Sequence, residues 1–420
     1  MAKRAAIDVR IDIYEPRDFS VPGPEGCNMC GGIVSESLVQ ALAVEGIHLP
    51  DDVVQRAIDS YILHTNQGNV HIETPHNEKR IATLHRGAGP KGVSKTLWKS
   101  FDALLLNLAR GEGARVLPAR VCDIVWRDKR PEIECRGKEP RPYDLVVVAC
   151  GVNTSGLRLL ENLGFGYRRP QTMQTFITEI MLGRKTIQEW FGSSMHLFLL
   201  SNPSIEFAAF IPKGDFVTVC LLGRSIDRAC VRSFFKDPAV RGCFPPTWRI
   251  PDDACRCSPK INVGEAIRPY ADRVVAVGDC GVSRLYKDGI GAAYRTAKAA
   301  ARTAIFSGVS AQDFDRHYAP IYSHLRRDNW LGRVLFSASG IVKRSPASVS
   351  SLLCVTAEEQ KLPFEKRRMS GVLWDMFTGS AAYGDILRRS MHPALAASFV
   401  QHIVRACDAG LEIVPKGGCG

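Results

Sequence analysis

The sequence contains no run of 18 apolar residues, so it predicts no membrane-spanning helix. No apolar signal core follows its first residues, and nothing in it predicts secretion. It shows no nucleic-acid-binding motif, no internal repeat and no low-complexity segment. With 45% hydrophobic and 23% charged residues, the composition excludes disordered, collagen-like and coiled-coil proteins. A chain of 420 residues therefore predicts two or three globular domains.

Acidic residues are fewer than basic ones, and the formal net charge is +12. A basic surface favours anionic lipid, nucleic acid or a phosphorylated substrate, but an ordinary soluble basic protein has the same balance. Because no nucleic-acid motif accompanies the charge, we expect no nucleic-acid partner. The oligomeric state is not predicted.

The 14 cysteines are numerous for a chain without a signal segment, and they indicate reduced cytosolic thiols rather than a disulfide framework. Two close pairs stand out, Cys27/Cys30 and Cys255/Cys257. The spacing of the second pair is poor for a four-sulfur zinc site, so the sequence predicts no metal.

The order of expected elements defines the fold class. Strands are expected over 5–14, 115–126, 143–149 and 273–278, and helices over 35–46, 99–110 and 288–306. Short strands with an antiparallel pattern fill 170–225, and the chain beyond residue 311 is largely helical. We therefore expect an α/β protein with a Rossmann-like FAD-binding domain, an inserted antiparallel β substrate lobe and a helical C-terminal region. The expected segments are 1–165 and 263–310 for the FAD domain, 166–262 for the lobe and 311–420 for the helices.

Two features suggest dinucleotide binding only weakly. Glu15 ends the first expected strand, where an acidic residue can accept hydrogen bonds from a ribose. One G-x-G-x-x-G match, Gly87, Gly89 and Gly92, follows a short strand, but Pro90 removes a backbone donor where a pyrophosphate would approach. We interpret this match as an ordinary loop.

Two strand ends carry stronger signals. The strand over 143–149 runs into Ala149-Cys150-Gly151, and glycine lets the chain turn close to a ligand. The strand over 273–278 ends at Gly278-Asp279, whose carboxylate can bind a sugar hydroxyl. Asp288-Gly289-Ile290-Gly291 then opens an Ala-rich helix, whose N-terminus can stabilise negative charge on a reduced flavin. A plain strand-to-helix turn would give the same pattern.

These pieces, together with Cys30-Gly31-Gly32 and Phe101-Asp102, make the chain similar to the geranylgeranyl reductase family of flavoprotein oxidoreductases, over roughly residues 5 to 310. The resemblance implies an FAD domain, with NAD(P)H as a transient reductant and no second Rossmann domain. Family members reduce isoprenoid double bonds, and some act at membrane surfaces. The resemblance implies FAD contacts at Glu15, Gly31, Gly32, Val121, Gly151, Gly278, Asp279, Asp288, Gly289, Ile290 and Gly291, and it places Cys30 beside the flavin ring.

The sequence departs from the family pattern at three places. The first strand and its glycine turn are absent before Glu15, so we expect an N-terminally truncated chain whose upstream coding sequence holds a G-x-G-x-x-G. Cys150 stands where the family has an aspartate. The segment from Phe207 to Pro212 keeps the proline of a lipid-binding signature without its tyrosine and tryptophan.

The sequence thus predicts an FAD-dependent oxidoreductase that uses NAD(P)H to reduce a double bond of a small apolar substrate, with isoprenoids as the candidate class. Cys30 or water would supply the proton. A redox dithiol of Cys27 and Cys30, or a tight structural turn, explains the same motif. A flavin monooxygenase and a non-catalytic fragment are the alternative functions. The expected location is the cytoplasm, with peripheral membrane contact compatible with the charge.

Overall fold

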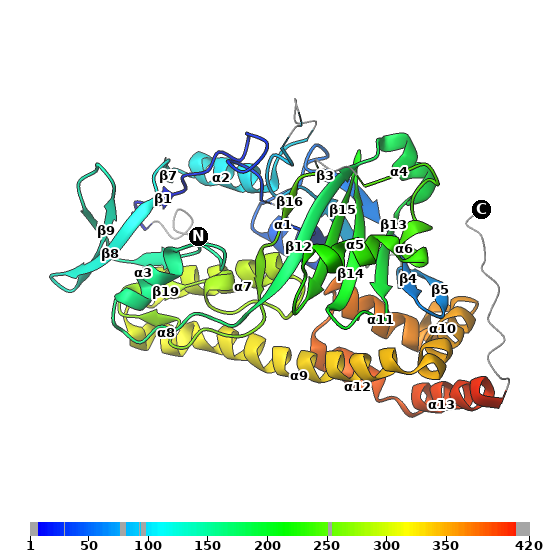
Figure 1. Ribbon diagram of the computed structural model, residues 1–420. Helices are drawn as coiled ribbons and strands as arrows, with labels where there is room; N and C mark the ends of the chain where they lie inside the picture. Colours follow the sequence, from blue (N-terminus) through cyan, green and yellow to red (C-terminus); the bar gives the residue numbers. More distant parts are fainter. Residues whose placement is uncertain are drawn as a thin grey trace. The chain divides into compact units, whose positions relative to one another are not determined.

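The computed structural model describes residues 7–28, 30–75, 81–91, 93, 98–250 and 254–408 (Figure 1). The chain divides into two compact units, each assembled from separate stretches of sequence. The first unit holds Met1–Asn28, Arg86–Met173 and Lys260–Trp330, and the second holds Met29–His85, Gln174–Pro259 and Leu331–Gly420. Residues 29–85, which the sequence-based division places with the FAD domain, thus cluster with the predicted substrate strands.

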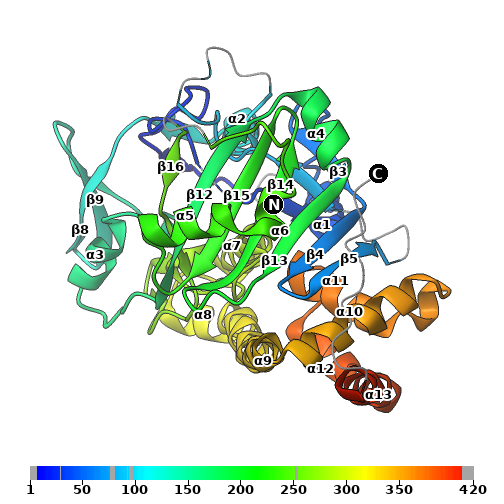
Figure 2. The same cartoon turned by 45° about the vertical axis from the view of Figure 1, so that its right-hand side comes forward.

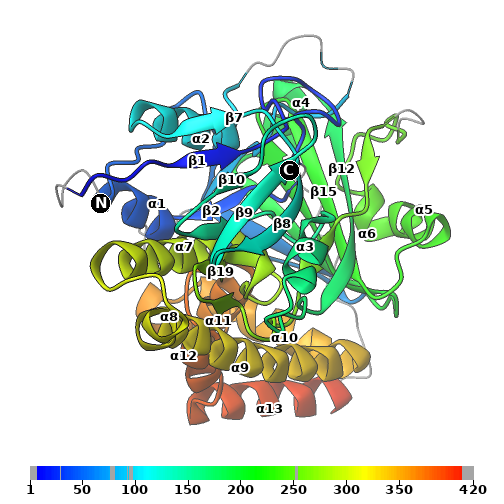
Figure 3. The same cartoon turned by 90° about the vertical axis from the view of Figure 1, so that its left-hand side faces the viewer.

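The first unit contains small sheets rather than one large one. Figure 3 shows β1 beside β7, and β8 and β9 as a hairpin. The sheets are the parallel pair β1 (Asp12–Tyr14) and β7 (Arg115–Leu117), the antiparallel set β8 (Val121–Arg127), β9 (Arg130–Cys135) and β10 (Arg141–Pro142), and the set β11 (Val146–Val148), β19 (Val274–Ala276) and β18 (Tyr270–Ala271). Only Asp12–Tyr14 of the predicted strand over 5–14 pairs, and residues 1–6 lie outside the described part. Pro118 separates β7 from β8, so the strand predicted over 115–126 is two strands.

β19 is buried on both faces, whereas β11 is buried on one face and its Val147 is 48% exposed. Val146, Val148 and Ala276 pack on helix α3 (Gly156–Asn162). The alternate residues Val275 and Val277 pack on the Ala-rich helix α7 (Gly289–Phe306) and on α8 (Ala311–His317). Successive side chains of a strand point to opposite faces, so a continuous apolar run suits a strand covered on both sides. The remaining elements of this unit are α2 (Phe101–Gly111), β17 (Lys260–Asn262), the 3₁₀ turn η2 (Gly278–Cys280) and the first part of α9 (Ala319–Arg344).

The second unit is built on one large sheet (Figure 2). Its strands run in the order β16 (Arg256–Cys257), β12 (Thr172–Met181), β15 (Phe216–Gly223), β14 (Ile205–Lys213), β13 (Ser194–Leu199), β4 (Ser60–Thr65) and β5 (Gly68–Glu73). The strands predicted over 170–225 are confirmed, and they pair antiparallel. Beyond them β13 pairs with β4 in parallel, and β4 and β5 were not expected in this sheet.

One face of this sheet carries the core of the second unit. Phe176, Phe198, Phe210 and Val219 lie on this face and pack against α4 (Arg184–Trp190), α5 (Arg228–Lys236) and α6 (Pro238–Arg241), which Figures 1 and 2 show across the strands. Asp227 caps α5 by accepting a hydrogen bond from the Cys230 amide at 2.7 Å. The opposite face also buries apolar residues such as Ile211, but it carries Glu179 and Thr218, and we refer to it as the polar face.

A smaller sheet and a helical region complete the second unit. The sheet is β2 (Ile33–Ser35), β6 (Ile81–Leu84) and β3 (Val54–Ile58), and helix α1 (Glu36–Val44) follows β2. The predicted C-terminal helices are confirmed as α10 (Pro346–Gln360), η3 (Phe364–Lys366), α11 (Arg368–Thr378), α12 (Tyr383–Ser390) and α13 (Pro393–Asp408). Trp374 of α11 stacks on Tyr61 of β4 with 5.2 Å between ring centroids, which anchors this region to the large sheet. Among the described helices, none combines the length and apolar character needed to cross a membrane.

Candidate functional site

In the first unit, two turns that the sequence singles out lie next to each other. Because β11 and β19 are parallel and in register from Val146↔Val274 to Val148↔Ala276, their carboxyl ends share one edge. Gly151 follows one strand and Gly278 the other, with φ values of 70° and 61° that favour glycine. The Gly151 amide donates to Cys280 Sγ at 3.1 Å. The edge of a parallel sheet where strands end is where α/β proteins bind ligands.

Asp279 lies against the first turn of α7. A Cβ added at Gly289 would stand 3.8 Å from Asp279 Oδ1, which is ordinary contact distance. The Gly278 amide donates to Thr296 Oγ1 of α7 at 2.9 Å, and a Cβ at Gly278 would come within 3.1 Å of Ala293 Cβ. Burial raises the pKa of the Asp279 carboxyl, while its hydrogen bond with Ser283 lowers it. The carboxyl and the positive end of α7 therefore face the same region.

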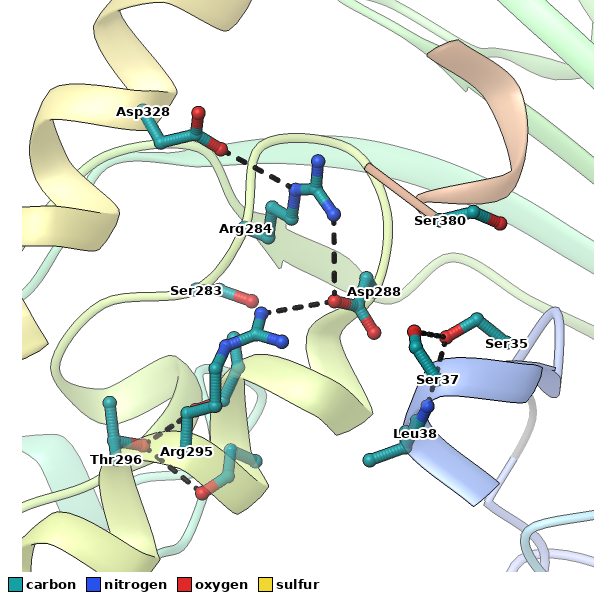
Figure 4. Close-up of polar contacts among 12 residues, drawn as sticks. Ser35, Ser37, Leu38, Ser283, Arg284, Asp288, Arg295, Thr296, Asp328 and Ser380 are labelled. Atoms are coloured by element: carbon teal, nitrogen blue, oxygen red, sulfur yellow. Dashed lines mark hydrogen bonds and ion pairs between the residues drawn. The ribbon is translucent and has the colours of Figure 1, made fainter. Parts of the chain in front are cut away.

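The N-terminus of α7 has no side-chain cap. Asp288 occupies the N-cap position in a left-handed conformation (φ 53°) and makes no capping hydrogen bond. Figure 4 shows its carboxylate turned instead towards Arg284 and Arg295, with Oδ2 3.7 Å and 3.0 Å from their nitrogens. Arg284 also pairs with Asp328 at 3.7 Å. This chain of alternating charges neutralises Asp288 and leaves the helix end positive.

Gly291 is fixed by the same carboxylate. A Cβ at Gly291 would overlap the Asp288 side chain, whereas a Cβ at Gly289 would make ordinary contacts. Ile290 lies between them and is partly exposed. The glycines of Asp288-Gly289-Ile290-Gly291 thus have different roles: Gly291 makes room for Asp288, and Gly289 lies within ordinary contact distance of Ser283 and Asp279.

Two other predicted cofactor contacts belong to the same unit. Glu15 follows β1, and its amide donates to Leu117 O at 3.1 Å. Its carboxylate accepts from Arg17 Nε at 3.2 Å, so this predicted ribose ligand is ion-paired. Val121 begins β8 and packs, partly buried, on the core around β11.

Sequence reasoning missed Arg86. Its guanidinium donates two hydrogen bonds to the Asp102 carboxylate, both at 3.0 Å, and Asn28 donates to the same carboxylate at 2.5 Å. The positive charge of Arg86 lowers the pKa of Asp279, so the two side chains interact. Arg86 directly precedes Gly87-Ala88-Gly89, and its place next to this glycine match was the one feature of the sequence that could have pointed to it. Gly92, the last glycine of the match, lies outside the described residues.

Cys30-Gly31-Gly32 belongs to the second unit and lies on the polar face of its large sheet. A Cβ at Gly31 would stand 3.3 Å from Ile211 and 3.9 Å from Cys220 Sγ. A Cβ at Gly32, where φ is 63°, would overlap Leu84 O. Lys213 Nζ donates to Cys30 O at 3.0 Å, and the Gly32 amide donates to Cys30 Sγ at 3.4 Å. The thiol of Cys30 is thereby oriented, and its position beside a flavin stays a prediction.

A buried charged cluster that the sequence did not reveal surrounds this segment. Glu179 Oε1 lies 3.2 Å from His85 Nδ1 and 3.7 Å from Lys213 Nζ, and it accepts a hydrogen bond from Thr218 at 3.2 Å. Burial alone would raise the pKa of Glu179, but the contacts with His85 and Lys213 lower it to about 2. Burial lowers the pKa of His85, and the neutral ring can still donate to Glu179 through Nδ1. Glu179 and Lys213 therefore form a charge pair inside the protein.

The neighbouring thiols are held in their protonated form. Burial raises the pKa of Cys220 and of Cys257 to about 12. Cys30, like these two cysteines, is partly exposed. Cys27, the other half of the C-x-x-C motif, belongs to the first unit.

The chain has the fold of flavoprotein oxidoreductases and hydroxylases. It is similar to a geranylgeranyl bacteriochlorophyll reductase-like protein from Thermoplasma acidophilum, with 14% identity, 97% of this chain and 94% of that chain covered, and a TM-score of 0.66. It is also similar to a flavoprotein/dehydrogenase from Cytophaga hutchinsonii (12% identity, 97% and 95% covered, TM-score 0.57) and to a 2-methyl-3-hydroxypyridine-5-carboxylic acid oxygenase (14%, 82% and 88%, 0.54). No family model and no curated protein matches. The expected α/β fold with a helical C-terminal region is confirmed at this level.

Proposed function

We propose that the chain is an FAD-dependent oxidoreductase that uses NAD(P)H to reduce a double bond of an apolar substrate, with isoprenoids as the leading class. The observation that carries the proposal is the edge where β11 and β19 end. There Asp279 and the uncapped N-terminus of α7 face one region of the first unit. The likeness to a geranylgeranyl bacteriochlorophyll reductase-like protein supports the choice of substrate class.

The residues of this edge suit FAD. The Asp279 carboxylate can accept a hydrogen bond from a hydroxyl of the sugar-alcohol chain, and Glu15 from a ribose hydroxyl. The helix end at Gly289 can stabilise negative charge on the ring system, because Arg284 and Arg295 already offset Asp288. Because Gly289 carries no side chain, its backbone is less screened than that of a larger residue. When bound, FAD supplies hydride transfer, and the protein contributes position and electrostatics.

The second unit would supply the proton and the substrate surface. Cys30 has a partly exposed thiol held by the Gly32 amide, and we assign it as the proton donor to the reduced carbon, with water as the alternative. Lys213 fixes the backbone of Cys30 and is itself neutralised by Glu179. The buried charges thus position this segment without requiring Glu179 to react.

The test uses the full chain with added FAD. Asp279→Asn keeps the side-chain size and removes the charge, so we expect FAD affinity to fall by about 10-fold or more, as loss of a charge-assisted hydrogen bond predicts. The matched control is Asp272→Asn, since Asp272 precedes the same strand and accepts only a surface hydrogen bond from the Ala311 amide. FAD binding is measured by absorption and flavin fluorescence.

Turnover separates the two enzymatic candidates. The reductase oxidises NADPH anaerobically when an isoprenoid alkene is present, and Cys30→Ala lowers that rate while FAD stays bound. The oxygenase and halogenase likenesses favour a monooxygenase as the second candidate, which consumes O₂ instead. A folded chain that takes up no FAD at any concentration would leave only the non-catalytic interpretation.

A further inference from the structure

Two histidines and one cysteine meet inside the second unit, away from the groups used above. His64 lies on β4 and His196 on β13, and Cys243 follows α6 by two residues. In the register of the sheet His196 stands opposite Phe210, and His64 opposite Phe198. The three side chains therefore lie on the face covered by α4–α6, opposite to the face of Glu179.

The separations between the donor atoms are those of a metal centre. His64 Nε2 lies 3.0 Å from His196 Nδ1, and Cys243 Sγ lies 3.3 Å from His196 Nδ1 and 3.7 Å from His64 Nε2. Around a tetrahedral Zn²⁺, with Zn–N of about 2.0–2.1 Å and Zn–S of about 2.3 Å, donors stand roughly 3.3 Å (N to N) and 3.5 Å (N to S) apart. The two nitrogen–sulfur distances bracket the ideal value, and the nitrogen–nitrogen distance is about 0.3 Å shorter than its ideal.

Burial makes the cluster costly without a ligand. His64, His196 and Cys243 are 7%, 3% and 4% exposed, and aromatic rings line the site, with His64 stacked on Phe198 at 4.7 Å. His196 Nε2 is buried and has no hydrogen-bond partner. Without an ion the three side chains contact one another and Cys243 Sγ donates to Ala239 O at 3.3 Å, whereas a cation would take one donor atom from each of the three residues.

We propose that His64 Nε2, His196 Nδ1 and Cys243 Sγ bind a thiophilic cation, Zn²⁺, that stabilises the fold, with a water molecule as its fourth ligand. Binding replaces the thiol proton of Cys243, which passes to solvent, and both imidazoles coordinate in their neutral form. Two imidazoles and one thiolate are a soft set that suits zinc rather than magnesium or calcium. The ion would join β4, β13 and the turn after α6, which are far apart in sequence. The spacing of neighbouring cysteines, on which the expectation of no metal rested, could not reveal this site.

The experiment measures metal in the full-length protein. After removal of metal with a chelator, Co²⁺ is titrated as a spectroscopic probe for Zn²⁺, and Zn²⁺ then competes for it. We expect one Co²⁺ per chain, with intense visible bands and a thiolate-to-cobalt charge-transfer band. Cys243→Ser should lose the charge-transfer band and weaken binding by at least about 100-fold, more than loss of an outer-shell partner costs. The matched control Cys230→Ser removes a partly buried thiol that packs on the same core and should change neither.

Several outcomes would overturn the assignment. A folded apo-protein that gives no thiolate–cobalt band refutes the site, and so does a band that persists in Cys243→Ser, because the sulfur would then belong to another cysteine. If Cys243→Ser does not fold, the wild-type chain decides: chelation should lower its melting temperature and Zn²⁺ should restore it. A melting temperature that changes neither on chelation nor on addition of Zn²⁺ contradicts a metal that stabilises the fold.

Discussion

The buried pair of Glu179 and Lys213 gives a prediction whose size follows from the structure. The Glu179 pKa of about 2 lies below its ordinary value of 4.5. That difference of about 2.5 units corresponds to roughly 3 kcal/mol of folding free energy at neutral pH. Removing one partner leaves the other charge buried, which costs about 3–5 kcal/mol. Both arguments lead to a loss of about 3 kcal/mol or more in Glu179→Gln.

The melting temperature is the practical measurement. For a unit of this size, a loss of about 3 kcal/mol lowers the midpoint by about 6–12 °C. The matched control is Glu206→Gln, because Glu206 pairs with Arg224 at 3.7 Å on the surface, where such pairs contribute about 0–1 kcal/mol. Adding Lys213→Met to Glu179→Gln removes the unpaired charge, so the double variant should melt above the single variant.

The pH dependence has a definite sign. A carboxyl whose folded-state pKa is depressed contributes its full stability above the unfolded value of about 4.5, and that contribution is lost as the pH falls from about 4.5 towards 2. Wild type should therefore lose more stability than Glu179→Gln across this window. Two results would refute a charged pair inside the protein. One is an equal loss of stability in wild type and Glu179→Gln between pH 4.5 and 2, and the other is a melting temperature of Glu179→Gln no lower than that of Glu206→Gln.

Two further predictions concern the first unit. Gly291→Ala should destabilise by about 1–3 kcal/mol, because its Cβ overlaps the Asp288 carboxylate, whereas Gly289→Ala should be neutral or stabilising in thermal melts; equal midpoints would contradict the assigned role of Gly291. A hydrogen bond with Cys280, 3.6 Å away, lowers the pKa of the exposed Cys150, so Cys150 should react with iodoacetamide before the partly exposed Cys257, whose pKa is raised, as mass spectrometry would show. Faster labelling of Cys257 would refute that order.

The parts of the site that depend on local sequence were predictable. Val274–Ala276 is a short run of β-branched and small residues, and the sequence from Asp288 onward combines glycines with an Ala-rich helix, so both elements could be placed by pattern. The helix predicted over 99–110 is confirmed as α2, where Ser100 caps the first turn by accepting from the Ala103 amide at 3.1 Å. Such signals lie within a few residues of the element that they start.

The parts that depend on distant pairing were not predictable. β4 is six residues long, and its parallel partner β13 follows more than 100 residues later, so nothing near β4 indicates the large sheet. Lys213 precedes Gly214 at a strand end, a position where lysine is ordinarily exposed, yet it is 1% exposed. Its burial depends on two partners distant in sequence, Glu179 on another strand and the backbone carbonyl of Cys30. His64 and His196 likewise lie on strands far apart in sequence, and only the pairing of β4 with β13 brings them together.

The alternation of side chains along the large sheet separates the two proposals made for the second unit. Across the neighbouring strands, His196 lies in one row with Phe210, Val219 and Thr178. Glu179 lies in the adjacent row, with Thr218 and Ile211. Adjacent positions of a strand face opposite sides, so the His64–His196–Cys243 cluster and the Glu179 cluster have the sheet between them. Loss of the metal therefore leaves the Cys30 segment supported by Lys213, and loss of Glu179 leaves the cation ligands in place. A failed test of one proposal therefore says nothing about the other. The FAD site proposed at the ends of β11 and β19 depends on neither, because it is argued from Asp279 and α7.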